Sequence, residues 1–126
     1  MIQNTVSATL SDQDAAAVLA AMATIKQKLP FLIDLSPEER RTLPKMGDKS
    51  RGFVRAALTV AQQNLDILPR AFDVDEFARD VALEEKLAGL SASFSKQAEL
   101  LDDTLVAVGS DAYVAALTVY QCARIA

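Results

Sequence analysis

The longest regular pattern of apolar positions lies between Asp73 and Gly109, in a stretch with no proline and one internal glycine, Gly89. Apolar residues recur there at steps of three and four, which is the spacing of one face of an α-helix. They are Leu83, Leu87, Leu90, Phe94, Leu101 and Val108. Asp73 is suited to cap the first turn, and Gly109 is expected to end the helix in a left-handed conformation. The pattern therefore predicts a helix over residues 74–108.

Two shorter helices are predicted before this long one. Ser11 is expected to cap the first, and Pro30 to end it, because the residue before a proline disfavours the α conformation. Its apolar stripe consists of Ala15, Val18, Met22, Ile25 and Leu29. The second helix is expected to begin near Asp48 and to fray near Asn64. Its apolar line consists of Val54, Leu58, Ala61 and Leu65.

The segment 31–46 joins these two helices and is too apolar to be a free linker. We expect it to wrap around the other helices. Within it, Ser36 at the cap, a proline in the first turn and Glu39 at the third position form a helix-start signature. A short helix should follow and end before Pro44. Residues 64–72, which contain Pro69, are predicted to form a turn.

A last helix is predicted from Asp111 onward, with Ser110 as its cap. Between residues 112 and 120 it is apolar on nearly every side, so it should be central or covered by another chain. Four main helices with short end connections predict an all-α, four-helix up-and-down bundle with a long wrapping connection between helices 1 and 2. It would form one domain over residues 1–126, and an irregular five-helix array is the alternative.

Composition agrees with an all-α fold, because 51% of the residues are hydrophobic but only 6% are aromatic. Cys122 is the single cysteine, so no disulfide can form within the chain. The N-terminus has no basic start, and the apolar stretches 15–25 and 112–120 are shorter than a membrane span requires. We therefore expect a soluble, cytoplasmic protein with no membrane partner.

Positive charge is concentrated between residues 40 and 55. The basic residues there are Arg40, Arg41, Lys45, Lys49, Arg51 and Arg55, against a single acid, Asp48. Lys45, Lys49 and Arg51 are candidates for binding an anion, because they surround the expected start of the second long helix. The segment lacks the upstream glycine of a phosphate-binding loop. Nucleic acid is not expected as a partner, because the chain is acidic overall and Phe53 is the single aromatic residue among these basic ones.

Internal pairing is the competing interpretation of these basic residues, and the one we favour. The first half of the long helix carries a matching acidic set, namely Asp73, Asp75, Glu76, Asp80, Glu84 and Glu85. A run of charge is usually a solvated or internally paired face rather than a binding site.

Asp102 and Asp103 interrupt a strongly apolar segment. At least one of them is a candidate buried carboxylate, which would need a partner. Together with glutamates they could hold Mg²⁺, Mn²⁺ or Ca²⁺ through oxygen atoms, but a surface position or an ion pair with Lys45 or Arg51 is the favoured interpretation. We assign no metal site and no cofactor. The chain has no histidine, so a di-iron bundle site cannot form.

Tyr113, Leu117 and Tyr120 are candidate interface residues on the last helix, where the two tyrosines are seven residues apart on one face. They could equally lie at the edge of the core. Cys122 would be reactive only if a cation such as Arg124 lowered its pKa. No histidine is present to activate it, so we interpret it as a packed residue and assign no catalytic residue.

Two short motifs carry a resemblance to a known group. Leu43-Pro44-Lys45-Met46-Gly47-Asp48-Lys49 precedes a helix, and Leu101-Asp102-Asp103-Thr104 is followed by Ala112-Tyr113-Val114-Ala115-Ala116-Leu117. In combination, over about residues 30–124, they resemble a group of small bacterial helical-bundle proteins of unassigned function. The resemblance implies a bacterial cytosolic bundle and supplies no catalytic residue.

The sequence therefore favours a binding protein over an enzyme. An enzyme that uses a pair of carboxylates as acid and base is a third hypothesis. We expect protein–protein interaction, and self-association into a homo-oligomer through the C-terminal helix. The alternative is a carrier for a small anion or a divalent metal, with a guest site near the start of the second long helix and Asp102.

Overall fold

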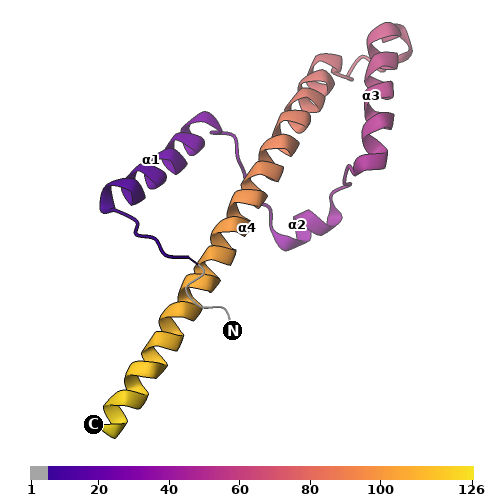
Figure 1. Ribbon diagram of the computed structural model, residues 1–126. Coiled ribbons are helices and arrows are strands. Elements are labelled where there is room, and N and C mark those ends of the chain that lie inside the picture. Colours follow the sequence, from indigo (N-terminus) through magenta and orange to yellow (C-terminus); the bar gives the residue numbers. More distant parts are fainter. Residues whose placement is uncertain (1–5) are drawn as a thin grey trace. The chain divides into compact units, whose positions relative to one another are not determined.

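The computed structural model describes residues 6–126 and is all-α over that range, with no strand. The prediction of an all-α protein is confirmed (Figure 1). The elements are α1 (Asp12–Lys28), α2 (Pro37–Thr42), α3 (Asp48–Gln63), the 3-10 turn η1 (Leu65–Ile67) and α4 (Val74–Ile125).

The helix starts lie where their capping residues predict them. Ser11 Oγ accepts a hydrogen bond of 3.0 Å from the N–H of Asp14, at the first turn of α1. Asp73 Oδ1 accepts one of the same length from the N–H of Glu76, at the first turn of α4. These bonds satisfy backbone donors that have no partner inside the helix. Short-range signals therefore fix where α1 and α4 begin.

The short helix α2 begins with a complete capping box. Ser36 Oγ accepts a hydrogen bond of 3.1 Å from the N–H of Glu39, and Glu39 Oε1 accepts one of 3.2 Å from the N–H of Ser36. The two residues thus satisfy each other's backbone donors. The helix ends at Thr42, before Pro44, as the sequence predicts.

The expected helix stop at Gly109 is wrong, because α4 continues through it to Ile125. Gly109 keeps the ordinary helical hand, with no positive φ. A glycine inside a helix costs about 1 kcal/mol relative to alanine, but good helix formers lie on both sides and no proline follows. The hydroxyls of Thr104 and Thr118 also donate hydrogen bonds to the carbonyl oxygens of Leu100 and Val114, each four residues earlier in the helix.

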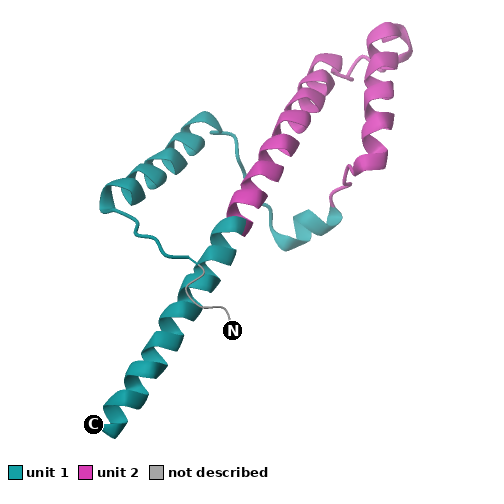
Figure 2. Ribbon diagram, in the orientation of Figure 1, with its two compact units in different colours: residues 1–42, 100–126 teal, residues 43–99 magenta. Residues whose placement is uncertain are grey.

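The two helices expected on either side of Gly109 are thus one helix, and the four-helix up-and-down arrangement is not confirmed. The chain divides into two compact units (Figure 2). Unit 1 combines the chain up to Thr42 with Leu100–Ala126, and unit 2 is Leu43–Glu99, so α4 contributes one half to each.

Unit 2 is a helical hairpin in which α3 and the first half of α4 run in opposite directions (Figure 2). Covered positions recur on both helices at steps of three and four, which is the pattern of two helices packed side by side. On α3 they are Val54, Ala57, Leu58 and Ala61, and on α4 they are Val74, Phe77, Ala78, Val81, Glu84, Leu87 and Ala88. Ala61, 4% exposed, is the only fully buried residue in the described part of the chain.

The closed end of this hairpin is held by aromatic contact. Phe72, which precedes α4, meets Phe77 edge to face, with ring centroids 6.0 Å apart and planes at 83°. Edge-to-face pairs of this kind are favourable because the positive ring edge meets the negative ring face. The predicted turn over residues 64–72 therefore also contributes to packing.

Unit 1 consists of α1, α2 and the second half of α4, and none of its described residues is fully buried. The apolar connection between α1 and α2 is exposed at Phe31, Leu32 and Ile33. The expectation that this connection wraps a core is therefore not met within unit 1. Its half-covered positions include Ala15, Ile25, Leu29 and Leu35.

Candidate functional site

The strongest polar contact of the hairpin involves Arg51, one of the three anion-binding candidates. Its Nη1 donates to Glu84 Oε1 at 2.9 Å, and its Nη2 lies 2.8 Å from Glu84 Oε2. This two-point geometry is the strongest form of an arginine–carboxylate pair. Both side chains are 32% exposed. The guanidinium is therefore already occupied by a carboxylate of α4.

A second pair links the same two helices one turn farther along. Arg55 Nε donates to Glu85 Oε1 at 2.8 Å, with side chains 65% and 44% exposed. Glu84 and Glu85 both belong to the acidic set that the sequence offers as a complement to the basic segment. For Arg51 and Arg55, internal pairing is therefore what the structure shows.

The other anion-binding candidates lie at the exposed entry to α3. Lys45 Nζ donates to the carbonyl oxygen of Leu43 at 3.2 Å. Lys49 is exposed in the first turn. Gly47 occupies the cap position and offers no side-chain hydrogen bond to the helix. These residues surround a helix N-terminus.

The two candidate buried carboxylates, Asp102 and Asp103, are exposed in the single chain. Their burial would thus require a second molecule. Among residues 6–126, no group of three or more acidic or cysteine side chains is arranged to hold a metal ion.

The three candidate interface residues are all exposed on the second half of α4. Tyr113 is 67% exposed, Leu117 43% and Tyr120 61%. The guanidinium carbon of Arg124 lies 5.8 Å from the centre of the Tyr120 ring, a cation–π contact. Cys122 is a free, exposed thiol rather than the packed residue expected from the sequence.

Exposure of apolar side chains extends well beyond these three residues. Large apolar residues are exposed on all sides of this half of α4, namely Leu100, Leu101, Leu105, Val106, Val108, Val114, Val119 and Ile125. A helix that is apolar all round is normally buried in a core, in an interface or in a membrane. This exposed apolar surface is the most pronounced feature of unit 1.

Sequence reasoning missed Val106 as a member of the candidate surface. It is 71% exposed and lies seven residues before Tyr113, at the same spacing that separates Tyr113 from Tyr120. The spacing was visible in the sequence. It was overlooked because Gly109 was expected to end the helix between Val106 and Tyr113.

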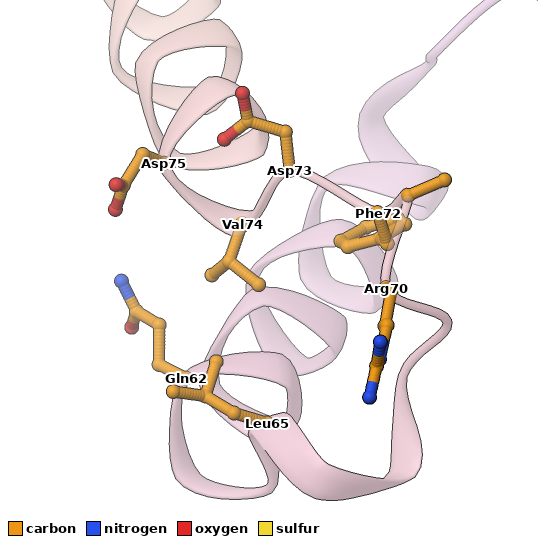
Figure 3. A pocket seen from close by; sticks show the side chains of 8 residues that line it. Gln62, Leu65, Arg70, Phe72, Asp73, Val74 and Asp75 are labelled. Atoms are coloured by element: carbon orange, nitrogen blue, oxygen red, sulfur yellow. The ribbon is translucent and has the colours of Figure 1, made fainter.

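A hollow of about 650 Å³ lies at the closed end of the hairpin (Figure 3). Arg70 points away from Asp73 and Asp75, so the opposite charges in the lining do not face one another. Asp73 is also engaged in capping α4. The arrangement offers no set of polar groups that would orient a small ligand.

An apolar hollow of about 570 Å³ lies elsewhere in unit 2, and Phe53, Val60, Phe72 and Phe77 contribute to its lining. Phe53 is 75% exposed at its rim. The hollow has no charged residue in its lining, so it provides no group for acid–base chemistry or for orienting a charged ligand.

By length and composition alone, α4 also meets the criterion for a helix that crosses a membrane. The core helices of soluble proteins meet the same criterion, so this is weak support for a span. The expectation of no membrane partner stays a prediction.

The fold and the exposed surface define only a broad class, that of an all-α protein with a long helix whose apolar side chains are largely exposed. No protein-family model, curated protein or solved structure matches the chain.

Proposed function

We propose that this chain acts by protein–protein interaction and self-associates through the second half of α4, residues 100–125. The observation that carries the proposal is the apolar surface of that half, which includes Tyr113, Leu117 and Tyr120. Soluble monomers rarely expose continuous apolar patches larger than a few hundred Å². Association would cover this surface and remove it from water.

The position of Asp111 argues for a protein partner over a lipid bilayer. A membrane span placed between Asp103 and Arg124 would hold Asp111 close to its middle. A carboxylate at the centre of a membrane helix opposes insertion by about 3 kcal/mol. A helix–helix interface has no such requirement, because Asp111 lies two residues before Tyr113 and so on the opposite side of the helix, outside the interface.

Self-association would also account for the four-helix pattern that the sequence suggests. Two chains would contribute two α4 helices, and the apolar stripe of each α1 could pack beside them. The resulting four-helix arrangement would thus form between chains instead of within one.

Size-exclusion chromatography with light scattering, over a range of protein concentrations, tests the proposal. Wild-type protein is expected to be a dimer or larger oligomer, and Tyr113→Ala with Tyr120→Ala to shift it toward monomer. Alanine is the best helix former, so α4 should retain its helical content, as circular dichroism would show.

Phe53→Ala is the matched control, because Phe53 is also an exposed aromatic residue on a helix but lies in unit 2. It should leave the mass unchanged. A wild-type protein that is monomeric at all concentrations would overturn the proposal. So would a protein that needs detergent to stay in solution and sediments with phosphatidylcholine vesicles, since that behaviour would indicate a membrane helix.

The second function that the sequence allows, a carrier for a small anion or a divalent metal, has no comparable support. Arg51 is engaged by Glu84, and Asp102 and Asp103 are exposed.

A further inference from the structure

We infer that the partner of this surface is a second copy of the chain in antiparallel orientation, with the two α4 helices crossing at Tyr113. This inference rests on the proposed self-association and adds its orientation and register. It concerns a single face of α4, which lies wholly within unit 1 and is defined below.

Seven residues at steps of three and four make up this face, which we call the tyrosine face. They are Asp102, Val106, Gly109, Tyr113, Leu117, Tyr120 and Arg124. At 100° per residue, all seven lie within about 40° of one line along the helix. Asp102, Tyr113 and Arg124 are each 11 residues apart, a spacing that returns almost to the same side of a straight helix. The face is about 33 Å long.

The tyrosine face has an acid at one end, a base at the other and apolar residues between them. Both charged residues are exposed, and so are the aromatic and aliphatic residues between them, Val106, Tyr113, Leu117 and Tyr120. A second copy related by a two-fold axis that passes through Tyr113, perpendicular to the helix, therefore brings each Asp102 opposite the Arg124 of the other copy.

The same two-fold operation matches the shapes of the residues in between. Val106 faces Tyr120 of the second copy, so that a small side chain lies opposite a large one. Gly109 faces Leu117, and nothing lies within 4 Å of the position that a Cβ at Gly109 would occupy. Tyr113 meets its own counterpart on the axis, which an isologous dimer requires.

A parallel pair in register would not have this complementarity. It would place Asp102 against Asp102 and Arg124 against Arg124, and like charges in contact oppose association. The charge pattern of the face thus selects the antiparallel orientation.

The leucine-rich side of the same half of α4 carries no such pair of opposite end charges. It is formed by Leu101, Leu105, Val108, Ala112 and Val119. Its large side chains are as exposed as those of the tyrosine face, with Leu101 at 69%, Leu105 at 68% and Val119 at 67%. The end charges, and not the degree of exposure, therefore select the tyrosine face for the second copy.

Disulfide trapping in the full-length chain distinguishes the two orientations. All variants carry Cys122→Ser, because the exposed native thiol would otherwise react. Val106→Cys mixed with a size-tagged Tyr120→Cys should give a mixed disulfide. Val106→Cys alone should not, since an antiparallel pair separates the two cysteines by about 21 Å along the axis, whereas a disulfide needs Cα atoms within about 7 Å. Ile67→Cys, in the exposed turn of unit 2, is the control for random collision.

Charge exchange provides an independent readout. Asp102→Arg should weaken the dimer about tenfold, and so should Arg124→Asp, because each places like charges at both ends of the interface. Mixing the two variants should restore a heterodimer of wild-type strength, because both end contacts then join opposite charges. In a parallel pair, neither Asp102→Arg nor Arg124→Asp would weaken the homodimer relative to wild type, because like charges would already face each other at both ends of the wild-type interface.

The outcomes separate this inference from the proposed function. A Val106→Cys dimer that crosslinks with itself faster than the mixed pair would overturn the antiparallel register and leave self-association standing. If the protein is a dimer but Val106→Cys crosslinks neither with itself nor with Tyr120→Cys, the interface lies elsewhere, and this result would also overturn the inference. A wild-type monomer would overturn both.

Discussion

Arg51 on α3 and Glu84 on α4 form a two-point ion pair, with nitrogen–oxygen contacts of 2.8 and 2.9 Å. The two residues are 33 positions apart in the chain, so the pair fixes the register of the two helices in unit 2. It also occupies the guanidinium of Arg51 with a carboxylate of the same chain.

A double-mutant cycle on Arg51→Ala and Glu84→Ala should give a coupling energy of about 1 kcal/mol, after allowance for the partial exposure of both groups. The second pair, Arg55 with Glu85, is more exposed and makes a single contact, so its coupling should be about 0.3 kcal/mol. Urea unfolding at one fixed protein concentration measures both. Equal coupling in the two cycles would contradict the importance assigned to the two-point geometry.

The capping box of α2 predicts a local dependence on pH. Hydrogen bonds with Ser36, first through its side chain and then through its backbone, hold the pKa of Glu39 below its ordinary value of 4.5. A lowered pKa in the folded state means that the ionised carboxylate stabilises α2 above that ordinary value. The stabilisation is lost as the pH falls through the lowered pKa.

Ser36→Ala should therefore raise the pKa of Glu39 toward its ordinary value, which NMR titration of the side-chain carboxyl carbon would measure. Ser11→Ala removes the cap of a different helix and serves as the control. If Ser11→Ala moves the Glu39 titration as much as Ser36→Ala does, the effect does not come from the capping box.

The outcome at Gly109 shows which signals in the sequence are sufficient and which are not. The starts of α1, α2 and α4 were predictable because each depends on a bond between residues three apart, such as that from Asp14 to Ser11. A glycine stop depends on a competition between continuing and ending the helix. Gly109 alone does not decide that competition.

The arrangement of helices was less predictable than their positions. The acidic complement to Arg51 and Arg55 could be named in advance, because acidic residues are concentrated on the first half of α4. The arrangement of the helices could not be derived from the sequence. An apolar stripe such as that of α1 indicates that a helix packs against a partner, but it does not identify that partner. Tyr113 and Tyr120 could be named as interface candidates because they lie on an apolar helix that needs a partner. That pattern did not identify the partner.

Replacing Gly109 tests the continuous helix directly. The residue is helical, and a Cβ there meets no atom within 4 Å, so Gly109→Ala should stabilise α4 by about 0.5–1 kcal/mol. Thermal unfolding followed by circular dichroism, in the Tyr113→Ala and Tyr120→Ala background, measures this without a contribution from assembly. Gly89→Ala should act in the same direction, because Gly89 is equally unobstructed.

Opposite signs at the two glycines would contradict a continuous helix. A left-handed glycine, as expected from the sequence at Gly109, is destabilised by alanine, whereas a helical one such as Gly89 is stabilised. A lower midpoint of thermal unfolding for Gly109→Ala, together with a higher one for Gly89→Ala, would therefore indicate that the helix ends at Gly109.

Thermal stability should depend on protein concentration, because Ala61 is the only fully buried residue that the described part of a single chain provides. Any folded state that binds a second copy gains stability by mass action, so the midpoint of unfolding should rise with each tenfold increase in concentration. Tyr113→Ala with Tyr120→Ala should flatten this dependence, whereas Phe53→Ala should preserve its slope even if it lowers every midpoint. A wild-type midpoint that is constant over three decades of concentration would show that the exposed half of α4 is stable without a second copy.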